Sequence, residues 1–501
     1  MIHVICKSEA YTYNVYHIMK AFFPSEKITI ETEEEASHYV SIRLPGGDGI
    51  RIGEDEIRGA SSRFVQDGDE FAGNGGHQPE SGEKPEKYWI DIVLYRELEK
   101  LTGHSLAWGI LTGVRPTKIA MEKLEEGWDE ERFVLWFQEE CKVSCQKAKL
   151  SFEIAGRERK LLGRLDCEDG YSLYVGIPFC PSVCTYCSFS SGALKDWKDR
   201  IWDYLKALQK ELAFIGEACA GKKLNTIYIG GGTPTTLTAD QLQCLLDCID
   251  GLFSREYLQE YTVEAGRPDS ITKEKLQVLK NHGITRISIN PQSMQQKTLD
   301  AIGRRHRVEE TAQAYHLARQ MEFDNINMDL IAGLPGETTE DMADTLEKIR
   351  ALAPDSLTVH SLAIKRAAKM ECKDLNPDAG QASRVLSEMI GMARETARKM
   401  GLFPYYLYRQ KNIAGNFENV GYARDGRAGI YNVLIMEEKQ SVIAAGAGAS
   451  TKVVLKNPVH VPGSKRKKMT RLLRSENVKD PGLYIEKIDE MIERKRKLLM
   501  G

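Results

Sequence analysis

The sequence has no apolar run that approaches the roughly 18 consecutive residues that suggest a membrane-spanning helix. Its N-terminal stretch, MIHVICKSEAYTYNVYHIMKAFFP, has no basic start followed by an apolar segment, so we expect no signal peptide. The formal net charge is only −3, and this balance gives no reason to expect a nucleic-acid partner. These absences predict a cytoplasmic protein without an integral membrane segment.

The composition is otherwise that of a globular protein with a large core, since apolar residues make up 42% and charged residues 28%. At about 100–200 residues per domain, a chain of this length predicts two to four structural units. The eleven cysteines are an odd number in a chain without an export signal. This favours a reducing compartment, with thiolates that bind metal or thiols that are buried.

The first 165 residues are predicted to form an α+β extension. The segments ITIETE and HYVSIRL alternate apolar and polar residues as half-buried strands do. Residues 64–87 are polar and rich in Gly, Glu and Pro, which predicts a mobile loop. Residues 88–165 are expected to be mainly helical, with one helix beginning near Pro116 or Thr117 in the stretch WGILTGVRPTKIAMEKL.

From residue 171 the pattern changes to short apolar strands that alternate with amphipathic helices. About six βα units are expected in residues 166–375, and such alternation predicts a parallel sheet with right-handed crossovers. Six units are too few for a complete eight-stranded barrel and indicate an open, partial (β/α)6 barrel of the α/β class. Residues 376–501 are expected to form a mainly helical C-terminal region. The predicted strands are SLYVGI, NTIYIGG, YTVEA, TRISIN, NINMDLIAG and SLTVHSL.

Three cysteines with the spacing C-x3-C-x2-C follow the first of these strands, and they are Cys180, Cys184 and Cys187. Three thiolates can bind three irons of a [4Fe-4S] cluster and leave the fourth iron open to a small molecule, whereas ordinary electron-transfer clusters use four cysteines. A structural zinc site usually has four ligands in two pairs, and no second pair with suitable context follows. The two remaining i,i+4 cysteine pairs are interpreted as buried helical thiols. These pairs are Cys141 with Cys145 and Cys244 with Cys248.

The stretch YVGIPFCPSVCTYCSF resembles the signature of the radical S-adenosylmethionine (SAM) superfamily. In particular it is similar to the branch of oxygen-independent coproporphyrinogen III dehydrogenase and the related haem chaperones. The resemblance implies a [4Fe-4S] cluster on the three cysteines and SAM as cofactor. It also places Tyr186, just before the third cysteine, near the adenine.

The resemblance continues in order along residues 165–450. It implies that the GGGTP segment contacts the SAM amino group and that acidic, amide and basic residues after later strands contact the rest of SAM. Glycines allow close approach of a ligand, carboxylates accept from hydroxyl or ammonium groups, and an arginine can clamp a carboxylate. The residues carried over are Gly231, Gly232, Thr233, Glu264, Gln292, Arg304, Asp329 and the Arg304 neighbour His306.

The reaction implied by this resemblance begins with one electron from the reduced cluster, which splits SAM into methionine and a 5′-deoxyadenosyl radical. In the dehydrogenase the radical takes hydrogen from a propionate, and loss of CO2 leaves a vinyl group. An electron donor of the flavodoxin or ferredoxin type is implied as partner, and residues 376–501 are expected to cover the substrate. Tyr174 stands where the dehydrogenase has a site tyrosine, although a core aromatic in the strand is an equal interpretation. Tyr174 and Arg304 are the candidate catalytic residues.

A porphyrinogen or haem substrate also needs cations for its carboxylates. Two groups are candidates, one around IGRRHR and one after the sixth strand. The basic stretch SKRKKMTRLLR could serve the same end, although a flexible surface segment is the preferred interpretation. A charge run is usually a solvated face, which is the competing interpretation of all three. The candidate cations are Arg304, Arg305 and Arg307 in the first group and Lys365 and Arg366 in the second.

The whole chain resembles the long firmicute-type subgroup of this family, because of LTGVRPTKI and the late GYARDGRAGIYNVLIMEEKQSVIAAGAGAST. For LTGVRPTKI the competing interpretation is a helix N-terminus with a buried Arg115. Phe189 replaces the fourth cysteine of the dehydrogenase motif, as in the chaperone-like branch, and EAGRP and Asn290–Pro291 also depart from the family pattern. Two alternatives therefore stay open: a haem chaperone that uses His306 or His360 as axial ligand, or a radical enzyme that degrades haem.

Overall fold

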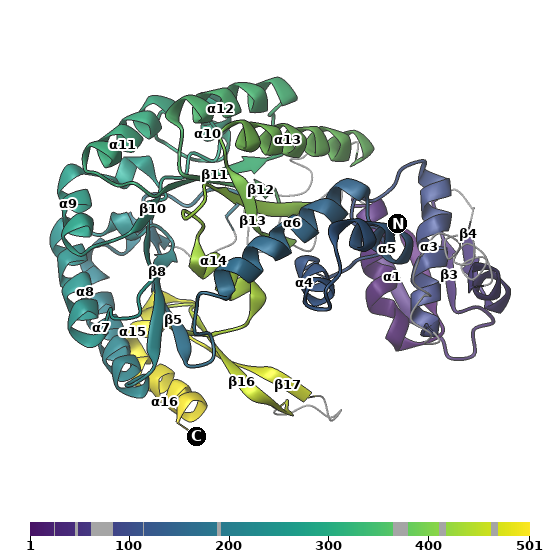
Figure 1. Ribbon diagram of the computed structural model, residues 1–501, viewed down its shortest axis with the longest axis horizontal. Coiled ribbons are helices and arrows are strands. Elements are labelled where there is room, and N and C mark those ends of the chain that lie inside the picture. The colour runs from purple at the N-terminus through teal and green to yellow at the C-terminus, as the bar shows by residue number, and fades with distance from the viewer. Residues whose placement is uncertain are drawn as a thin grey trace. The chain divides into compact units, whose positions relative to one another are not determined.

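The computed structural model describes residues 1–24, 26–45, 49–61, 84–113, 115–187, 192–363, 379–409, 417–461 and 469–500. The chain divides into two compact units (Figure 1). The first unit comprises Met1–Phe152, Leu375–Arg384 and Arg409–Glu418, and the second comprises Glu153–Asp374, Val385–Tyr408 and Asn419–Gly501. The expected boundaries at residues 165 and 375 stay predictions.

The first unit contains a four-stranded mixed sheet in the order β2-β1-β3-β4. Strand β1 runs parallel to β2 and antiparallel to β3. Apolar residues of β1, α1 and α3 form its core, including Val4, Ile18 and Leu94, which are nearly or fully buried. The elements are β1 Ile2–Cys6, α1 Glu9–Phe22, β2 Ile28–Thr32, β3 Val40–Arg43, β4 Gly49–Ile52, α3 Glu86–Thr102, α4 Thr117–Glu125 and α5 Glu130–Cys141.

Several predictions about this first part are confirmed. Strands β2 and β3 fall on the two alternating segments, and α4 begins at Thr117 after Pro116, which fits a proline that precedes the first helical turn. Residues 64–83 of the loop predicted at 64–87 lie outside the described residues. The end of that segment already belongs to α3, which begins at Glu86. Arg115 is half-buried, so the alternative of a buried arginine is wrong.

The first unit also contains a buried polar network around Trp108. The indole nitrogen of Trp108 donates to Glu418 Oε2 at 2.8 Å, and Lys147 pairs with the other carboxylate oxygen. Arg409 donates to the carbonyl oxygens of Leu111 and Gly113 at 3.0 and 3.2 Å. A buried ion pair that is also hydrogen-bonded resists disruption, so this network fixes the segment that leads into the TGVRPTKI motif.

The second unit is built on six neighbouring parallel strands, which confirms the partial (β/α)6 barrel. They follow the order of the chain, β5-β8-β9-β10-β11-β12, and helices lie outside them (Figure 1). The strands are β5 Gly170–Ile177, β8 Lys223–Gly231, β9 Glu260–Glu264, β10 Arg286–Ser288, β11 Ile326–Ala332 and β12 Ser356–Ser361. The helices are α7 Ile201–Ala218, α8 Ala239–Leu252, α9 Lys273–Asn281, α10 Gln296–Ala301, α11 Val308–Gln320 and α12 Thr339–Leu352.

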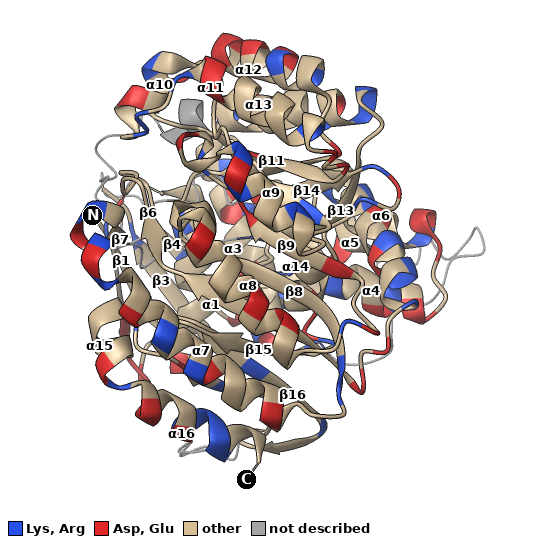
Figure 2. Ribbon diagram, turned by 90° about the vertical axis from the view of Figure 1, so that its left-hand side faces the viewer, with Lys and Arg blue, Asp and Glu red and all other residues tan. Residues whose placement is uncertain are grey.

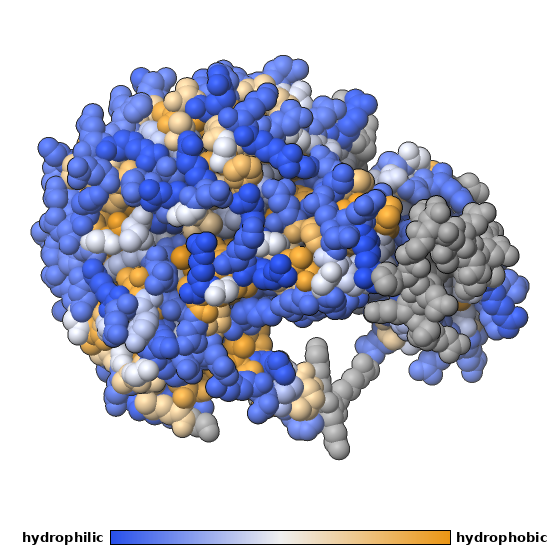
Figure 3. All heavy atoms as spheres, in the orientation of Figure 1, coloured by the Kyte–Doolittle hydropathy of each residue, from blue (hydrophilic) through white to orange (hydrophobic). Residues whose placement is uncertain are grey.

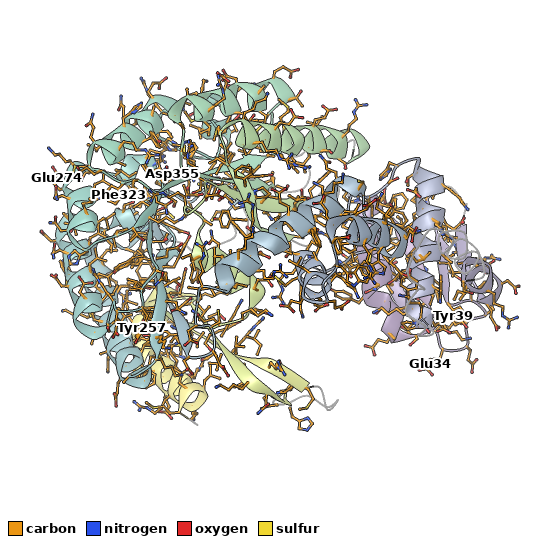
Figure 4. The ribbon with its side chains drawn as sticks, in the orientation of Figure 1. Glu34, Tyr39, Tyr257, Glu274, Phe323 and Asp355 are labelled. Carbon is orange, nitrogen blue, oxygen red and sulfur yellow. The ribbon has the colours of Figure 1, made fainter. Side chains whose placement is uncertain are left out.

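Local sequence explains where these elements begin. Strand β5 is buried at seven of its eight positions, as expected of a strand covered on both faces. Thr238 and Thr338 cap α8 and α12 with capping boxes, which satisfy the first free amides of each helix. Asp355 accepts from the Ile326 amide at 2.8 Å and pairs with Arg319 at 2.8 Å, which ties the start of β12 to β11 (Figure 4).

The sheet extends beyond these six strands at both edges, which the sequence did not predict. Strand β14 pairs antiparallel with β12, and β15 pairs parallel with β5. The complete order is β13-β14-β12-β11-β10-β9-β8-β5-β15-β16-β17. The C-terminal region has the expected helices together with these strands. Its elements are α13 Ala379–Lys399, β13 Phe403–Arg409, β14 Glu418–Ala423, α14 Ile430–Glu437, β15 Ser441–Ala445, β16 Ser450–His460, β17 Met469–Glu476, α15 Pro481–Glu486 and α16 Ile488–Leu499.

A second buried network fixes the loop after β15 beside the end of β5. Glu211 and Lys495, both with fully buried side chains, form an ion pair at 2.9 Å. Glu211 also accepts from the Gly446 amide at 2.8 Å and from the Tyr484 hydroxyl at 2.6 Å. A Cβ on Gly446 would lie 2.6 Å from the carbonyl oxygen of Gly176, so only glycine fits there. Helices α15 and α16 thereby fix this loop at the carboxyl ends of β5 and β15.

The outer helices of the barrel carry both signs of charge side by side (Figure 2). In the view of Figure 3, hydrophilic residues cover most of the visible face, and hydrophobic residues form small groups. Among the described helices, none combines the length and the apolar character needed to cross a bilayer.

Candidate functional site

The three predicted cluster ligands follow β5 within a few residues: Cys180 ends the short strand β6, Phe179–Cys180, and Cys184 and Cys187 lie on the loop after it. Cys184 is 8% exposed, and Cys180 and Cys187 are half-buried. The loop is fastened to the segment after α10, because the Thr185 amide donates to Ile302 O at 3.1 Å and the Ser182 hydroxyl donates to Gly303 O at 3.2 Å.

The described residues contain no group of three His, Cys, Asp or Glu side chains arranged to hold a single metal ion. A zinc ion draws its ligands to one point, whereas the cysteines of an iron–sulfur cluster each bind a different iron.

The glycine segment at the end of β8 brings its backbone close to this loop. A Cβ on Gly232 would lie 2.6 Å from Phe179 O, and a Cβ on Gly231, whose φ is +106°, would lie 2.9 Å from the Tyr174 hydroxyl. The Thr233 amide donates to Phe179 O at 2.7 Å, and the Thr233 hydroxyl group lies 3.5 Å from Cys180 Sγ. No larger residue fits at these two glycines, so the cradle that they form is specific to glycine.

Glu264 lies at the end of the next strand, β9, against the same glycine segment. Its Oε2 accepts from the Gly231 amide at 3.3 Å, and its Oε1 accepts from the Tyr228 hydroxyl. Burial raises the pKa of Glu264 to about 7, and the charge of Asp329 adds to this shift. The carboxyl group therefore changes its protonation state near neutral pH and can both accept and donate a proton.

Asp329 on β11 faces His360 on β12. His360 Nε2 lies 3.7 Å from Asp329 Oδ2, the Tyr408 hydroxyl lies 3.4 Å from His360 Nδ1, and Asn327 donates to Asp329 Oδ1 at 2.6 Å. Burial opposes the charge of Asp329, but its interactions with His360 and Asn327 outweigh burial and lower the pKa of Asp329. Asp329 is therefore an ionised acceptor at neutral pH, whereas Glu264 is close to half-protonated.

Three tyrosine rings stack beside Glu264. Tyr174 of β5 lies 6.2 Å from Tyr228 of β8 and 6.3 Å from Tyr431 of α14, and Tyr228 lies 4.4 Å from Tyr431, with interplanar angles of 14–21°. Burial raises the pKa of all three phenols, so they are protonated at neutral pH. Glu260 caps the first amides of α14, with Ile430 N at 2.5 Å from its Oε2, and this fixes Tyr431 against the other rings.

Gln292 and Arg304 lie after β10 and after α10, respectively. Gln292 has a φ of +68°, its amide donates to Asp329 O at 2.9 Å, and its buried Oε1 has no hydrogen-bond partner among the described residues. Arg304, 5% exposed, donates to Asn290 O, while its Nε likewise lacks a partner among them. Burial opposes the charge of Arg304, yet Tyr186 and Cys184 raise its pKa. These unused polar atoms are available to a ligand.

His306 is 1% exposed, and neither ring nitrogen has a hydrogen-bond partner in the described parts of the chain. Burial, followed by the charge of Arg304, lowers its pKa to about 4, so the imidazole is neutral at neutral pH.

The other cation candidates in IGRRHR do not share the burial of Arg304. Arg305 and Arg307 are exposed while Arg304 is buried, so the three do not form one cluster. Lys365, Arg366 and Phe189 lie outside the described residues, as do residues 464–468 of the basic stretch.

The interpretation of the remaining cysteine pairs as buried thiols is wrong for Cys145, which is exposed at the start of α6, Cys145–Leu162. Cys141, Cys244 and Cys248 are half-buried. Cys141 ends α5 and Cys145 begins α6, so the i,i+4 spacing of this pair spans two helices and does not place both thiols on one buried face.

The sequence interpretation missed Tyr228, Tyr431 and Arg267 as members of this site. Tyr228 stands two residues before the glycine segment, and Arg267 stands in EAGRP, the motif that departs from the family pattern. Those two positions could have been found from their place at strand ends. Tyr431 could not, because it arrives on α14 from more than 200 residues away in the chain.

Comparison with known proteins agrees with this geometry. Residues 174–349 match the radical SAM superfamily. The oxygen-independent coproporphyrinogen-III oxidase-like protein HemZ of Bacillus subtilis is 38% identical over 492 residues, which cover 96% of this chain and 94% of that protein. The haem chaperone HemW of the same organism is 35% identical over 195 residues, 39% of this chain.

One oxygen-independent enzyme and one solved structure are further similar proteins. The coproporphyrinogen III oxidase of Escherichia coli is 30% identical over 229 residues. This chain matches about half of the length of that enzyme and of HemW, 50% and 51%. The solved structure of the E. coli coproporphyrinogen III oxidase HemN aligns with a TM-score of 0.51 at 22% identity and covers 66% of this chain and 72% of that one, which supports the fold.

Proposed function

Because this chain belongs to the radical SAM superfamily, in the family of the oxygen-independent coproporphyrinogen-III oxidase-like protein HemZ, we propose that it decarboxylates coproporphyrinogen III oxidatively. Two propionate side chains become vinyl groups, and the product is protoporphyrinogen IX. The single observation that carries this proposal is the similarity to HemZ over nearly the whole of both chains. As in its superfamily, the cofactors are a [4Fe-4S] cluster and SAM.

The residues at the top of the barrel fit these cofactors. Cys180, Cys184 and Cys187 are the proposed cluster ligands, and they leave one iron for the amino and carboxylate groups of SAM. The glycine cradle, the unused Gln292 Oε1 and the unused Arg304 Nε supply the mixture of acceptors and donors that SAM requires. When bound, the cluster and SAM supply a carbon radical that can take hydrogen from an unactivated carbon.

The protein's own carboxylates divide the binding of SAM between them. Asp329, whose pKa is lowered, is a permanent acceptor for ribose hydroxyl groups. Glu264, beside the Gly231 amide, accepts from the ammonium or a hydroxyl group, and contact with a cation favours its ionised form. Tyr186 lies on the cysteine loop and interacts with Arg304. It is the proposed neighbour of the adenine.

Tyr174 is the proposed residue on the substrate side. Its hydroxyl group lies beside Gly231, and its ring stacks with Tyr228 and Tyr431. Such a block of rings offers a flat apolar surface beside the reacting carbon and keeps water from it. A flavodoxin-like or ferredoxin-like protein is the proposed electron donor.

The decisive experiment is anaerobic. The reconstituted protein receives SAM, a reductant and coproporphyrinogen III, and mass spectrometry follows the products. Loss of one and then two CO2 units, together with 5′-deoxyadenosine, is the expected result. Formation of 5′-deoxyadenosine with an unchanged porphyrinogen rejects this substrate, and haem then becomes the substrate to test for radical degradation.

A haem chaperone is the second candidate, because the part of the chain that matches HemW is 35% identical to it. His360, 26% exposed in its side chain, is the better of the two proposed axial ligands, since His306 is almost completely buried. Anaerobic titration with haem separates the two functions. A stoichiometric Soret shift that is lost in His360→Ala, without porphyrinogen turnover, favours the chaperone.

A further inference from the structure

Arg267 connects the end of β9 to the cysteine loop. Its guanidinium group is 3% exposed and is fully engaged on one edge, where Nε and Nη2 donate to the two carboxylate oxygens of Asp269 at 3.0 and 2.8 Å. Its Nη1 points the other way and donates to Ser182 O and Ser182 Oγ, both at 3.2 Å. The same nitrogen lies 3.9 Å from Cys184 Sγ.

We propose that Arg267 is a positioning residue that fixes the cysteine loop and stabilises the reduced cluster through the thiolate of Cys184. This role rests on the proposed function, because it requires that the three cysteines hold a cluster. It does not depend on the tetrapyrrole substrate, and it adds a residue to the machinery that the family signature does not name.

The first part of the role follows from the position of Ser182. Its hydroxyl group donates to Gly303 O, while its carbonyl group accepts from Arg267. The loop is therefore held from two elements that are distant in the sequence, the end of β9 and the segment after α10. Cys184 lies two residues beyond Ser182, so a loop held at Ser182 presents the thiolate in a fixed place.

The second part follows from charge. Reduction adds one electron to a cluster that already carries three thiolates, and hydrogen bonds to the cluster sulfurs are among the known determinants of its potential. A buried cation beside a ligand sulfur stabilises the more negative, reduced form. The neighbouring His306 has a pKa near 4 and is neutral, so at neutral pH the charge near Cys184 comes from Arg267 and Arg304, offset by Asp269.

Asp269 supplies the test that a purely structural role would fail. Its carboxylate neutralises part of the Arg267 charge, and its side chain is 23% exposed. Arg267→Gln removes the cation from Cys184, whereas Asp269→Asn leaves that cation uncompensated. If Arg267 acts electrostatically, the two substitutions shift the reduction equilibrium in opposite directions. If Arg267 only braces the loop, both loosen it in the same direction.

The measurement is the midpoint potential of the cluster in the full-length protein, reconstituted anaerobically and titrated with EPR detection. Arg267→Gln is expected to make reduction about tenfold less favourable, which corresponds to about 59 mV for one electron. Asp269→Asn is expected to raise the potential. The double variant is expected to fall between the two. Arg255→Gln is the matched control. It breaks the ion pair with Asp250, which precedes β9, and leaves the potential unchanged.

Equal potentials in wild type, Arg267→Gln and Asp269→Asn overturn the inference, and so do two shifts of the same sign. If Arg267→Gln retains too little iron to titrate, Arg267→Lys takes its place. It keeps the charge but loses the fork, so a potential close to that of wild type supports the electrostatic role and a fall of about 59 mV overturns it. Failure of the proposed function has a different signature: coproporphyrinogen III stays unchanged while the cluster still titrates, or the wild type lacks the iron, the sulfide and the EPR signal of a [4Fe-4S] cluster altogether.

Discussion

The hydroxyl group of Tyr228 donates to Glu264, and the ring of Tyr228 stacks 4.4 Å from that of Tyr431. Tyr228 thus connects the carboxyl group of Glu264, at the end of β9, to α14, a helix that follows much later in the chain. The tyrosine hydrogen bond lowers the pKa of Glu264, while burial raises it to about 7. The balance between these two effects makes pH a useful probe of the site.

Glu264 is expected to make the apoprotein less stable as pH rises. Its pKa in the folded protein, about 7, lies above the ordinary value of 4.5, so its contribution is complete below pH 4.5 and is lost as pH rises through 7. At 1.36 kcal/mol for each pKa unit, the difference is on the order of 3 kcal/mol. Thermal unfolding of wild type and Glu264→Gln between pH 5 and 8 checks this. The difference between their free energies of unfolding is expected to change with pH. A constant gap contradicts the raised pKa.

Tyr228→Phe is expected to raise the pKa of Glu264 further, because it removes the hydrogen bond that favours the carboxylate. SAM binding, measured anaerobically by calorimetry, then weakens at pH 7 and recovers at higher pH. Tyr257→Phe, at an exposed tyrosine before β9, is the control and leaves the pH profile unchanged. A Tyr228→Phe profile that coincides with wild type removes the hydrogen bond from the explanation.

Gly232→Ala is expected to abolish SAM binding and to destabilise the protein, because the new Cβ lies 2.6 Å from a backbone oxygen. Overpacking of this kind typically costs about 1–3 kcal/mol. The matched control is Gly251→Ala in α8, where nothing lies within 4 Å and alanine favours the helix by about 1 kcal/mol. Calorimetry of SAM binding and denaturant unfolding test both variants. Normal SAM affinity in Gly232→Ala counts against the cradle.

Replacement of Cys184 by alanine is expected to abolish SAM cleavage, and the same holds for Cys180 and Cys187. Cys244→Ala in α8 is the control and is expected to cleave SAM normally. Release of 5′-deoxyadenosine, measured anaerobically with dithionite as reductant, decides the outcome. Wild-type release from Cys184→Ala rejects the ligand assignment.

His360→Phe is expected to raise the pKa of Asp329, since His360 provides a main part of the interaction that keeps that carboxylate ionised. The acid limit of SAM binding then moves to higher pH. His316→Phe, at an exposed position on α11, is the control. SAM affinity measured between pH 5 and 8 tests the shift, and an unmoved acid limit shows that His360 does not act on Asp329.

The local part of this architecture could be predicted from the sequence. Strand β5 and the glycine segment have patterns that operate over a few residues, and the three cysteines lie within eight positions. Contacts between distant segments could not be predicted in this way. The pairing of β15 with β5 and the stacking of Tyr431 on Tyr228 both join segments more than 200 residues apart, and neither leaves a local signal.

The state of individual side chains was also beyond the sequence. Arg304 and Arg305 are neighbours in the chain, yet one is buried and the other exposed, because only Arg304 turns toward Asn290 and the cysteine loop. A cluster of cations in a sequence therefore does not establish a cluster in space.

The ion pair of Glu211 with Lys495 has a consequence for the order of assembly. During synthesis the strands of the barrel leave the ribosome long before α16, so Glu211 must wait for its partner while the rest of its unit is already made. An unpaired carboxylate buried at that point is costly. We therefore expect the loop after β15 to be fixed in place only when the last helix docks.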